Sequence, residues 1–125
     1  YEEEFIIDLK DRFKKGLIDM LLLKVLSEHD CYGYQITQIF KRVSDGSIVV
    51  REPSMYPILY RLQDRGLITS YNQKGNGHME RVYYHIEDAG REELKKMSDA
   101  YQEVQRGVES IMNYTEAISD LREAR

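Results

Sequence analysis

The chain has 125 residues, of which 42% are hydrophobic and 32% are charged, which is enough for one domain with a buried core. The single cysteine, Cys31, excludes an intramolecular disulfide, and no apolar run approaches the roughly 20 residues that a membrane span requires. Because the N-terminal residues lack a signal-peptide pattern, we expect a cytoplasmic protein.

Positive charge is concentrated in the middle of a chain whose net charge is −4. Residues 1–9 contain four acidic and no basic residues, and residues 83–125 contain ten acidic and six basic ones. Residues 10–82 contain twelve Lys and Arg against eight Asp and Glu. A local excess of one sign says more about a partner than the bulk charge does, and this excess favours nucleic acid.

Three helices are expected before residue 47. The apolar spacing predicts a short amphipathic helix before Gly16, a helix with a wide buried face from Leu17 to Leu26, and a third helix over 34–43 that ends at a left-handed Gly46. The apolar side chains of the first helix are Phe5, Ile6, Leu9 and Phe13. The expected core-facing side chains are Leu17, Leu21, Leu22, Val25 and Leu26 in the second helix and Ile36, Ile39, Phe40 and Val43 in the third.

A fourth, short helix is expected from Ser54 to Gly66. The β-branched residues 47–51 before it predict a small strand or an extended connector. Ser54 is the expected N-cap, which places Pro57 in the first turn, where it removes no internal hydrogen bond. Helical spacing directs Met55, Leu59 and Leu62 to the core and leaves Tyr56, Tyr60 and Arg61 outside it.

A β-hairpin follows the fourth helix directly. Leu67 to Tyr71 and Arg81 to Ile86 have strand patterns, with Tyr84 on the core side, and the polar residues 72–80 are the expected loop. A helix that exposes tyrosines and an arginine beside a basic hairpin tip suits a winged-helix DNA reader, because the helix enters the major groove and the tip lies along the phosphates. The expected fold is mainly α with a small β-hairpin.

Residues 88–123 have a helical pattern with an apolar heptad seam. The seam continues for about three and a half heptads, which predicts a left-handed coiled coil with a partner helix. We therefore expect an N-terminal helix over 1–15, a winged helix-turn-helix domain over 16–87 and a homodimerisation helix over 88–125. The alternative is a last helix that folds back on its own domain. The seam residues are Leu94, Met97, Tyr101, Val104, Val108, Ile111, Thr115 and Ile118.

The sequence indicates no enzyme, no metal site and no cofactor. His29, His78 and His85 are not spaced as ligands, and Cys31 has no second cysteine with which to complete a tetrahedral set. Residues 75–77 lack the strand-to-helix context and the Lys-Ser/Thr pair of a phosphate-binding P-loop. Cys31 is interpreted as a packed thiol.

Several blocks together resemble the PadR family of transcriptional regulators. They follow the family's order and spacing over about residues 16–94, roughly two-thirds of the chain. One block alone would be weak evidence, because so short a motif can occur by chance, but the whole set is specific for the family. The blocks are Leu21-Leu22-Leu23, Tyr32-Gly33-Tyr34-Gln35-Ile36, Met55-Tyr56-Pro57-Ile58-Leu59 with Leu62, Gly66-Leu67-Ile68, Gly77, Arg81-Val82-Tyr83-Tyr84 and Ala89-Gly90-Arg91.

The resemblance implies a dimeric repressor or activator that binds a near-palindromic operator, and we expect a repressor. It implies that Tyr34 contacts a backbone phosphate, and that Ser54, Tyr56 and Tyr60 approach base edges or phosphates. It also implies that the wing contacts the sugar-phosphate backbone or the minor groove. The wing residues implied are Lys74, Asn76, Gly77, His78 and Arg81.

Three alternatives stay open. Arg61 is a candidate DNA contact, or it forms a surface ion pair with Asp64 or Asp11. A winged-helix protein-interaction adaptor, which docks its coiled-coil helix on a partner, needs the same core and seam but no positive wing. Lastly, Phe5, Met97 and Tyr101 can line a pocket for a small aromatic effector that releases DNA, although a dimer seam requires the same side chains.

Overall fold

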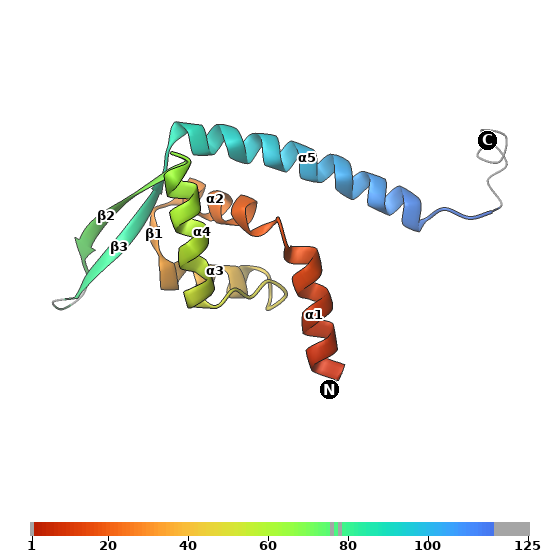
Figure 1. Ribbon diagram of the computed structural model, residues 1–125, viewed down its shortest axis with the longest axis horizontal. Coiled ribbons are helices and arrows are strands. Elements are labelled where there is room, and N and C mark those ends of the chain that lie inside the picture. Colours follow the sequence, from red (N-terminus) through yellow and green to blue (C-terminus); the bar gives the residue numbers. More distant parts are fainter. Residues whose placement is uncertain (1, 76, 78, 117–125) are drawn as a thin grey trace. The chain divides into compact units, whose positions relative to one another are not determined.

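The computed structural model describes residues 2–75, 77 and 79–116, without the side chains of residues 3–8. It consists of two units, residues 1–94 and 95–125. No helix among the described residues is long and apolar enough to cross a membrane. In chain order the elements are α1 (Glu2–Lys14), α2 (Ile18–Glu28), β1 (Cys31–Tyr32), α3 (Gly33–Val43), α4 (Glu52–Asp64), β2 (Ile68–Lys74), β3 (Glu80–Ile86) and α5 (Asp88–Met112) (Figure 1).

The core of the first unit lies between α2, α3, α4 and the base of the sheet. Leu22, Ile36 and Leu59 are fully shielded from water. Burying an aliphatic side chain of this size contributes about 1.5–3 kcal/mol to stability. The burial expected from the sequence is confirmed for Leu22, Leu26, Ile36, Phe40, Met55, Leu59, Leu62 and Tyr84. Leu23, Cys31, Leu67, Ile68 and Ile86 are buried with them.

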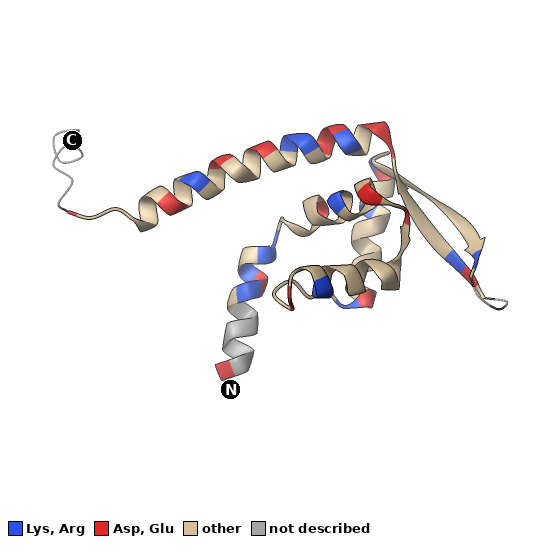
Figure 2. Ribbon diagram, turned by 180° about the vertical axis from the view of Figure 1, so that it is seen from behind, with Lys and Arg blue, Asp and Glu red and all other residues tan. Residues whose placement is uncertain are grey.

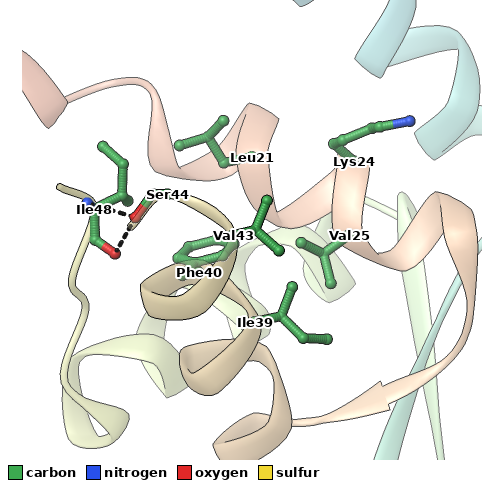
Figure 3. Close-up of a pocket in the computed structure, with 8 residues that line it drawn as sticks. All are labelled: Leu21, Lys24, Val25, Ile39, Phe40, Val43, Ser44 and Ile48. Carbon is green, nitrogen blue, oxygen red and sulfur yellow. Dashed lines mark hydrogen bonds between the residues drawn. The ribbon is translucent and has the colours of Figure 1, made fainter. Parts of the chain in front are cut away.

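Val43, which was expected in the core, is exposed, and so is Phe13 on the apolar side of the first helix. Val43 is 77% exposed because the last turn of α3 borders an open apolar pocket of about 170 Å³ between α2 and α3. Figure 3 shows Val43 with Leu21 and Val25 around this pocket. Phe13 is 78% exposed because no described element covers that side of α1. The apolar side chains of Phe5 and Ile6 lie outside the described part of the structure.

Helix α4 begins two residues before Ser54, so the predicted Ser54 cap is wrong. Arg51 has an extended backbone and precedes the helix, and Pro53 lies in its first turn, where the fixed φ of proline favours a helix start. The backbone N–H of Ser54 donates to the carbonyl of Arg51 at 2.9 Å. Pro57 therefore lies inside the helix and not in its first turn.

The hairpin belongs to a three-stranded antiparallel sheet of order β1-β3-β2. Its strands extend to the pair Lys74 and Glu80, so the predicted loop over 72–80 is too long. The sequence did not predict β1, because a two-residue strand is too short to have a pattern. Residues 47–51 form a connector and not a strand.

Helix α5 starts in the first unit and ends earlier than predicted. Gly90 permits its close approach to the sheet, because a Cβ there would clash with the carbonyl oxygen of Leu67. The described residues 113–116 are not helical, so the predicted continuation through them is wrong. Asn113 is a weak helix former at this end. Ile118 lies outside the described residues.

Candidate nucleic-acid interface

A concave surface lies between the N-terminus of α3, the face of α4 that carries Glu52, Tyr56 and Tyr60, and the wing strand β3. The cavity has a volume of about 390 Å³, and we call it the helix–wing cavity. It brings together four residues predicted to contact DNA, which come from three segments that lie far apart in the sequence. Its walls include Tyr34 from α3, Glu52, Tyr56 and Tyr60 from α4, and Glu80 and Arg81 from β3.

The N-terminus of α3 forms one wall of this cavity. The backbone N–H of Tyr32, the residue before the helix, donates to Oε1 of Gln35 at 3.4 Å. Tyr34, in the first turn, is 51% exposed. A helix N-terminus presents unpaired N–H groups and the positive end of the helix dipole, which favour an anion such as phosphate. Tyr34 is therefore well placed for the predicted phosphate contact.

The tyrosines of α4 form a second wall, next to the N-terminus of α3. The hydroxyl of Tyr56 donates to Oε1 of Glu52 at 2.7 Å. This hydrogen bond is the main cause, and burial the second, of a rise in the pKa of Tyr56 to about 12. The phenol therefore keeps its proton at neutral pH. The rings of Tyr56 and Tyr60 stack with centroids 6.3 Å apart, and Tyr60 is 56% exposed.

Arg81 is held on the wing by an aromatic ring. Its guanidinium carbon lies 4.5 Å from the ring centroid of Tyr32, which is a cation–π contact. Tyr32 in turn meets Tyr83 edge to face, with centroids 5.4 Å apart, and Tyr83 stacks on Tyr71 at 5.8 Å. These rings are cross-strand neighbours in β1, β3 and β2, so they orient Arg81 from the sheet itself.

Asp30, the residue before β1, is hydrogen-bonded to both strands of the wing. Its carboxylate accepts hydrogen bonds from the hydroxyl of Tyr71 at 2.6 Å and from Nδ1 of His85 at 2.8 Å. Burial raises the pKa of Asp30, but these two hydrogen bonds outweigh it and hold the pKa below its ordinary value. The carboxylate is therefore the stable form, and it fixes the base of the wing.

The remaining predicted DNA contacts lie outside this cavity or outside the described residues. Lys74 is exposed at the end of β2, where it pairs with Glu80 of β3. Figure 2 shows basic and acidic positions together on the hairpin near its tip. Ser54 is exposed on α4, and Gly77 has a left-handed φ of 82°. Asn76 and His78 lie outside the described residues. Arg61 pairs with Asp19 of α2 at 2.7 Å, so the predicted pairing with Asp64 or Asp11 is wrong.

Two residues at this surface were missed by the sequence analysis. Glu52 accepts the hydroxyl of Tyr56, and Tyr32 supports Arg81. The Glu52–Tyr56 spacing of four residues is a signal for contact on one helix face, but a helix that starts at Ser54 excludes it. Nothing in the sequence placed Tyr32 beside Arg81, because that contact depends on the unpredicted strand β1.

The predicted seam residues on α5 are largely open to solvent in the single chain. Val104, Val108 and Ile111 are 63%, 54% and 73% exposed. Tyr101 is 38% exposed, whereas Leu94 and Met97 are half-buried. The predicted pocket between Phe5, Met97 and Tyr101 stays a prediction, because the side chain of Phe5 is outside the described part.

A helix-turn-helix with an antiparallel wing, both bordering one cavity, defines a winged helix-turn-helix protein. Residues 22–96 match the sequence model of the "Transcriptional regulator PadR-like family". The chain therefore belongs to the PadR-like family of transcriptional regulators, which confirms the resemblance. It is also 26% identical over 98 residues to an uncharacterised protein of Lysinibacillus sphaericus, covering 78% of this chain and 90% of that protein.

Solved structures of PadR-like regulators have the same fold. A regulator from Bacillus cereus has a TM-score of 0.73 at 27% identity, over 83% of this chain and 99% of that chain. A PadR family regulator from Eggerthella lenta has a TM-score of 0.75 at 24% identity, over 91% of this chain and 97% of its own. Bacillus subtilis PadR in complex with operator DNA has a TM-score of 0.60 at 27% identity, over 66% of this chain and 46% of that chain.

Proposed function

We propose that this regulator binds double-stranded DNA sequence-specifically, as a homodimer on a near-palindromic operator, and represses transcription. The helix–wing cavity carries this proposal. It joins the first half of α4, which a winged helix inserts into the major groove, to a wing that carries Arg81. The similar fold of Bacillus subtilis PadR, solved in complex with operator DNA, supports it.

In this proposal each surface has a separate task. Tyr34 and the N-terminus of α3 hold a phosphate, and Lys74 and Arg81 hold the backbone beside the wing. Ser54, Tyr56 and Tyr60 approach base edges from α4. The wing residues Asn76, Gly77 and His78, and Arg61 on α4, remain proposed contacts.

A homodimer accounts for the exposed seam of α5. An apolar stripe over Val104, Val108 and Ile111 is unfavourable in water and suits a second copy of the same helix. Two copies present two recognition helices, whose half-sites lie about 34 Å or a multiple of it apart on DNA. Two copies also double the phosphate contacts, so affinity falls steeply with salt.

Repression and effector release are the finer parts of the proposal. A dimer seated on an operator represses by excluding polymerase from the same DNA. A small aromatic effector that binds beside Met97 and Tyr101 changes the dimer and releases the operator. Thermal-shift screening with aromatic compounds tests the effector: stabilisation that is lost in Tyr101→Ala supports it, and no stabilisation by any compound contradicts it.

Selection of duplexes from a random library with the purified chain tests DNA recognition. We expect an enriched motif with two inverted half-sites. If no motif is enriched and the chain instead forms a stable complex with another protein through α5, the interaction adaptor is the better assignment. Transcription from a promoter carrying the selected motif, with and without the chain, then separates a repressor from an activator.

A further inference from the structure

We infer that Glu52 is a base-reading residue whose carboxylate accepts a hydrogen bond from the exocyclic amino group of a cytosine in the major groove. Tyr56 positions this carboxylate. The inference rests on the proposed DNA binding and adds to it the identity of one base in each half-site.

Glu52 stands where a recognition helix meets base edges. It is the first residue of α4, and the N-terminal residues of recognition helices contact base edges. Its side chain is half-buried in the wall of the helix–wing cavity. When α4 enters the major groove, this carboxylate is therefore among the first side chains to meet base edges.

A carboxylate at this position is repelled by the DNA phosphates, so it is unfavourable unless a donor forms a hydrogen bond to it. Within the described part of the chain, no Lys or Arg forms an ion pair with Glu52. The positive end of the α4 dipole stabilises the charge in the free protein. On DNA the charge needs a partner, and a base amino group is a donor that the major groove supplies.

Tyr56 fixes one of the two carboxylate oxygens of Glu52. The phenol donates to Oε1 at 2.7 Å, which leaves Oε2 to accept from another donor. The phenol is itself confined, because it stacks on Tyr60 and lies against Gly33, where a Cβ would be 2.9 Å from the hydroxyl oxygen. The raised pKa of Tyr56 keeps it a donor. The second oxygen is thus preorganised, which lowers the entropy cost of binding.

The chemistry of the major groove selects cytosine for this acceptor. Cytosine presents its N4 amino donor there without an acceptor of its own. Guanine presents two acceptors, and thymine presents an acceptor and a methyl group, so both repel or fail to bind a carboxylate. Adenine presents an amino donor, but its neighbouring N7 acceptor repels the carboxylate.

The alternative role for Glu52 is that it only stabilises the helix start, and this role predicts a different result. A structural role changes stability and affects all DNA sequences equally. A base contact changes the preference at one position of each half-site. The preference profile therefore separates the two roles, whereas affinity for a single duplex does not.

Duplex selection with the full chain, its Glu52→Ala variant and its Glu52→Gln variant tests the inference. We expect the wild type to prefer cytosine by about tenfold at one position of each half-site. We expect Glu52→Ala to lose that preference and keep the others. Glu52→Gln should shift it toward adenine, because a glutamine amide binds adenine N6 and N7 together. Thermal melting verifies that each variant is folded.

A matched control and a second variant complete the test. Asp64→Asn removes one negative charge from the other end of α4 and should leave every base preference unchanged. Tyr56→Phe removes the hydroxyl that fixes the carboxylate and should weaken the cytosine preference less than Glu52→Ala does. A wild-type motif that Glu52→Ala retains in full overturns this inference alone. Absence of any wild-type motif overturns the proposed function as well.

Discussion

The winged-helix unit and the C-terminal half of α5 differ in where their apolar side chains lie. In the first unit, Leu22, Ile36 and Leu59 are fully buried within one chain. In the second, Val104, Val108 and Ile111 remain more than half exposed. The difference teaches that the first unit completes its core within a single chain, whereas α5 leaves apolar side chains exposed, which the proposed dimer would cover. The variants below alter one of these regions and leave the other intact.

The largest expected effect comes from breaking the seam. Val108→Glu places a charge in the proposed dimer contact, which we expect to dissociate the homodimer and weaken operator binding on the order of 10³-fold, because the two half-sites are then bound independently. Analytical ultracentrifugation and a binding titration measure both. Gln105→Glu, on the same helix but outside the seam, is the control. A Val108→Glu chain that remains dimeric would contradict the role of the seam.

Breaking the core of the first unit should act on folding. Leu59→Ala removes a fully buried side chain and leaves a cavity, so we expect it to lower the free energy of unfolding by about 3 kcal/mol. Urea denaturation followed by circular dichroism measures this. Val104→Ala is the comparison: Val104 is exposed and lies outside the first unit. In the dissociated chain this variant should change the stability of the first unit little. Equal effects of the two variants would erase the contrast between the regions.

The wing offers a smaller, electrostatic test. Arg81→Ala should weaken binding to all duplexes by about tenfold and reduce the salt slope by about 0.9 for each phosphate that is no longer neutralised, hence about 1.8 for a dimer. Fluorescence anisotropy at several salt concentrations measures the slope. Lys95→Ala, on an exposed part of α5, is the matched control. If Arg81→Ala leaves the slope unchanged, Arg81 does not bind phosphate.

The smallest effect concerns the base of the wing. Because the pKa of Asp30 is lowered in the folded chain, its ionised form stabilises the fold above the ordinary Asp pKa, about 3.9. That contribution is lost as the pH falls through the folded-state pKa. Asp30→Asn should therefore cost about 1 kcal/mol at pH 7 and flatten the loss of stability between about pH 5 and 3. Parallel urea melts of both chains at several pH values test this, and identical pH profiles would contradict it.

Regular patterns made most of the fold predictable. The helical spacing of Met55, Leu59 and Leu62 and the alternation around Tyr84 correctly marked the core, because burial imposes those periods. The start of α4 was wrong because Ser54 looked like a cap while Pro53 sets the first turn. Val43 fits the helical period but lies beyond the packed part of α3.

The candidate site was only partly predictable. Tyr34, Tyr56, Tyr60 and Arg81 were selected from the sequence, and the structure brings them to one cavity. The interactions that orient them were not predictable, because they depend on pairing between distant segments. Tyr32 reaches Arg81 only through β1, and Asp30 binds Tyr71 and His85 across 41 and 55 residues of sequence.

The mass of the complex between this chain and its selected duplex tests the central claim most directly. Multi-angle light scattering measures it on the purified complex. The account predicts two chains on one duplex with two inverted half-sites, and much weaker binding of the same two-chain dimer when one half-site is scrambled. A single chain on the intact duplex, or binding that ignores the half-sites, would contradict it.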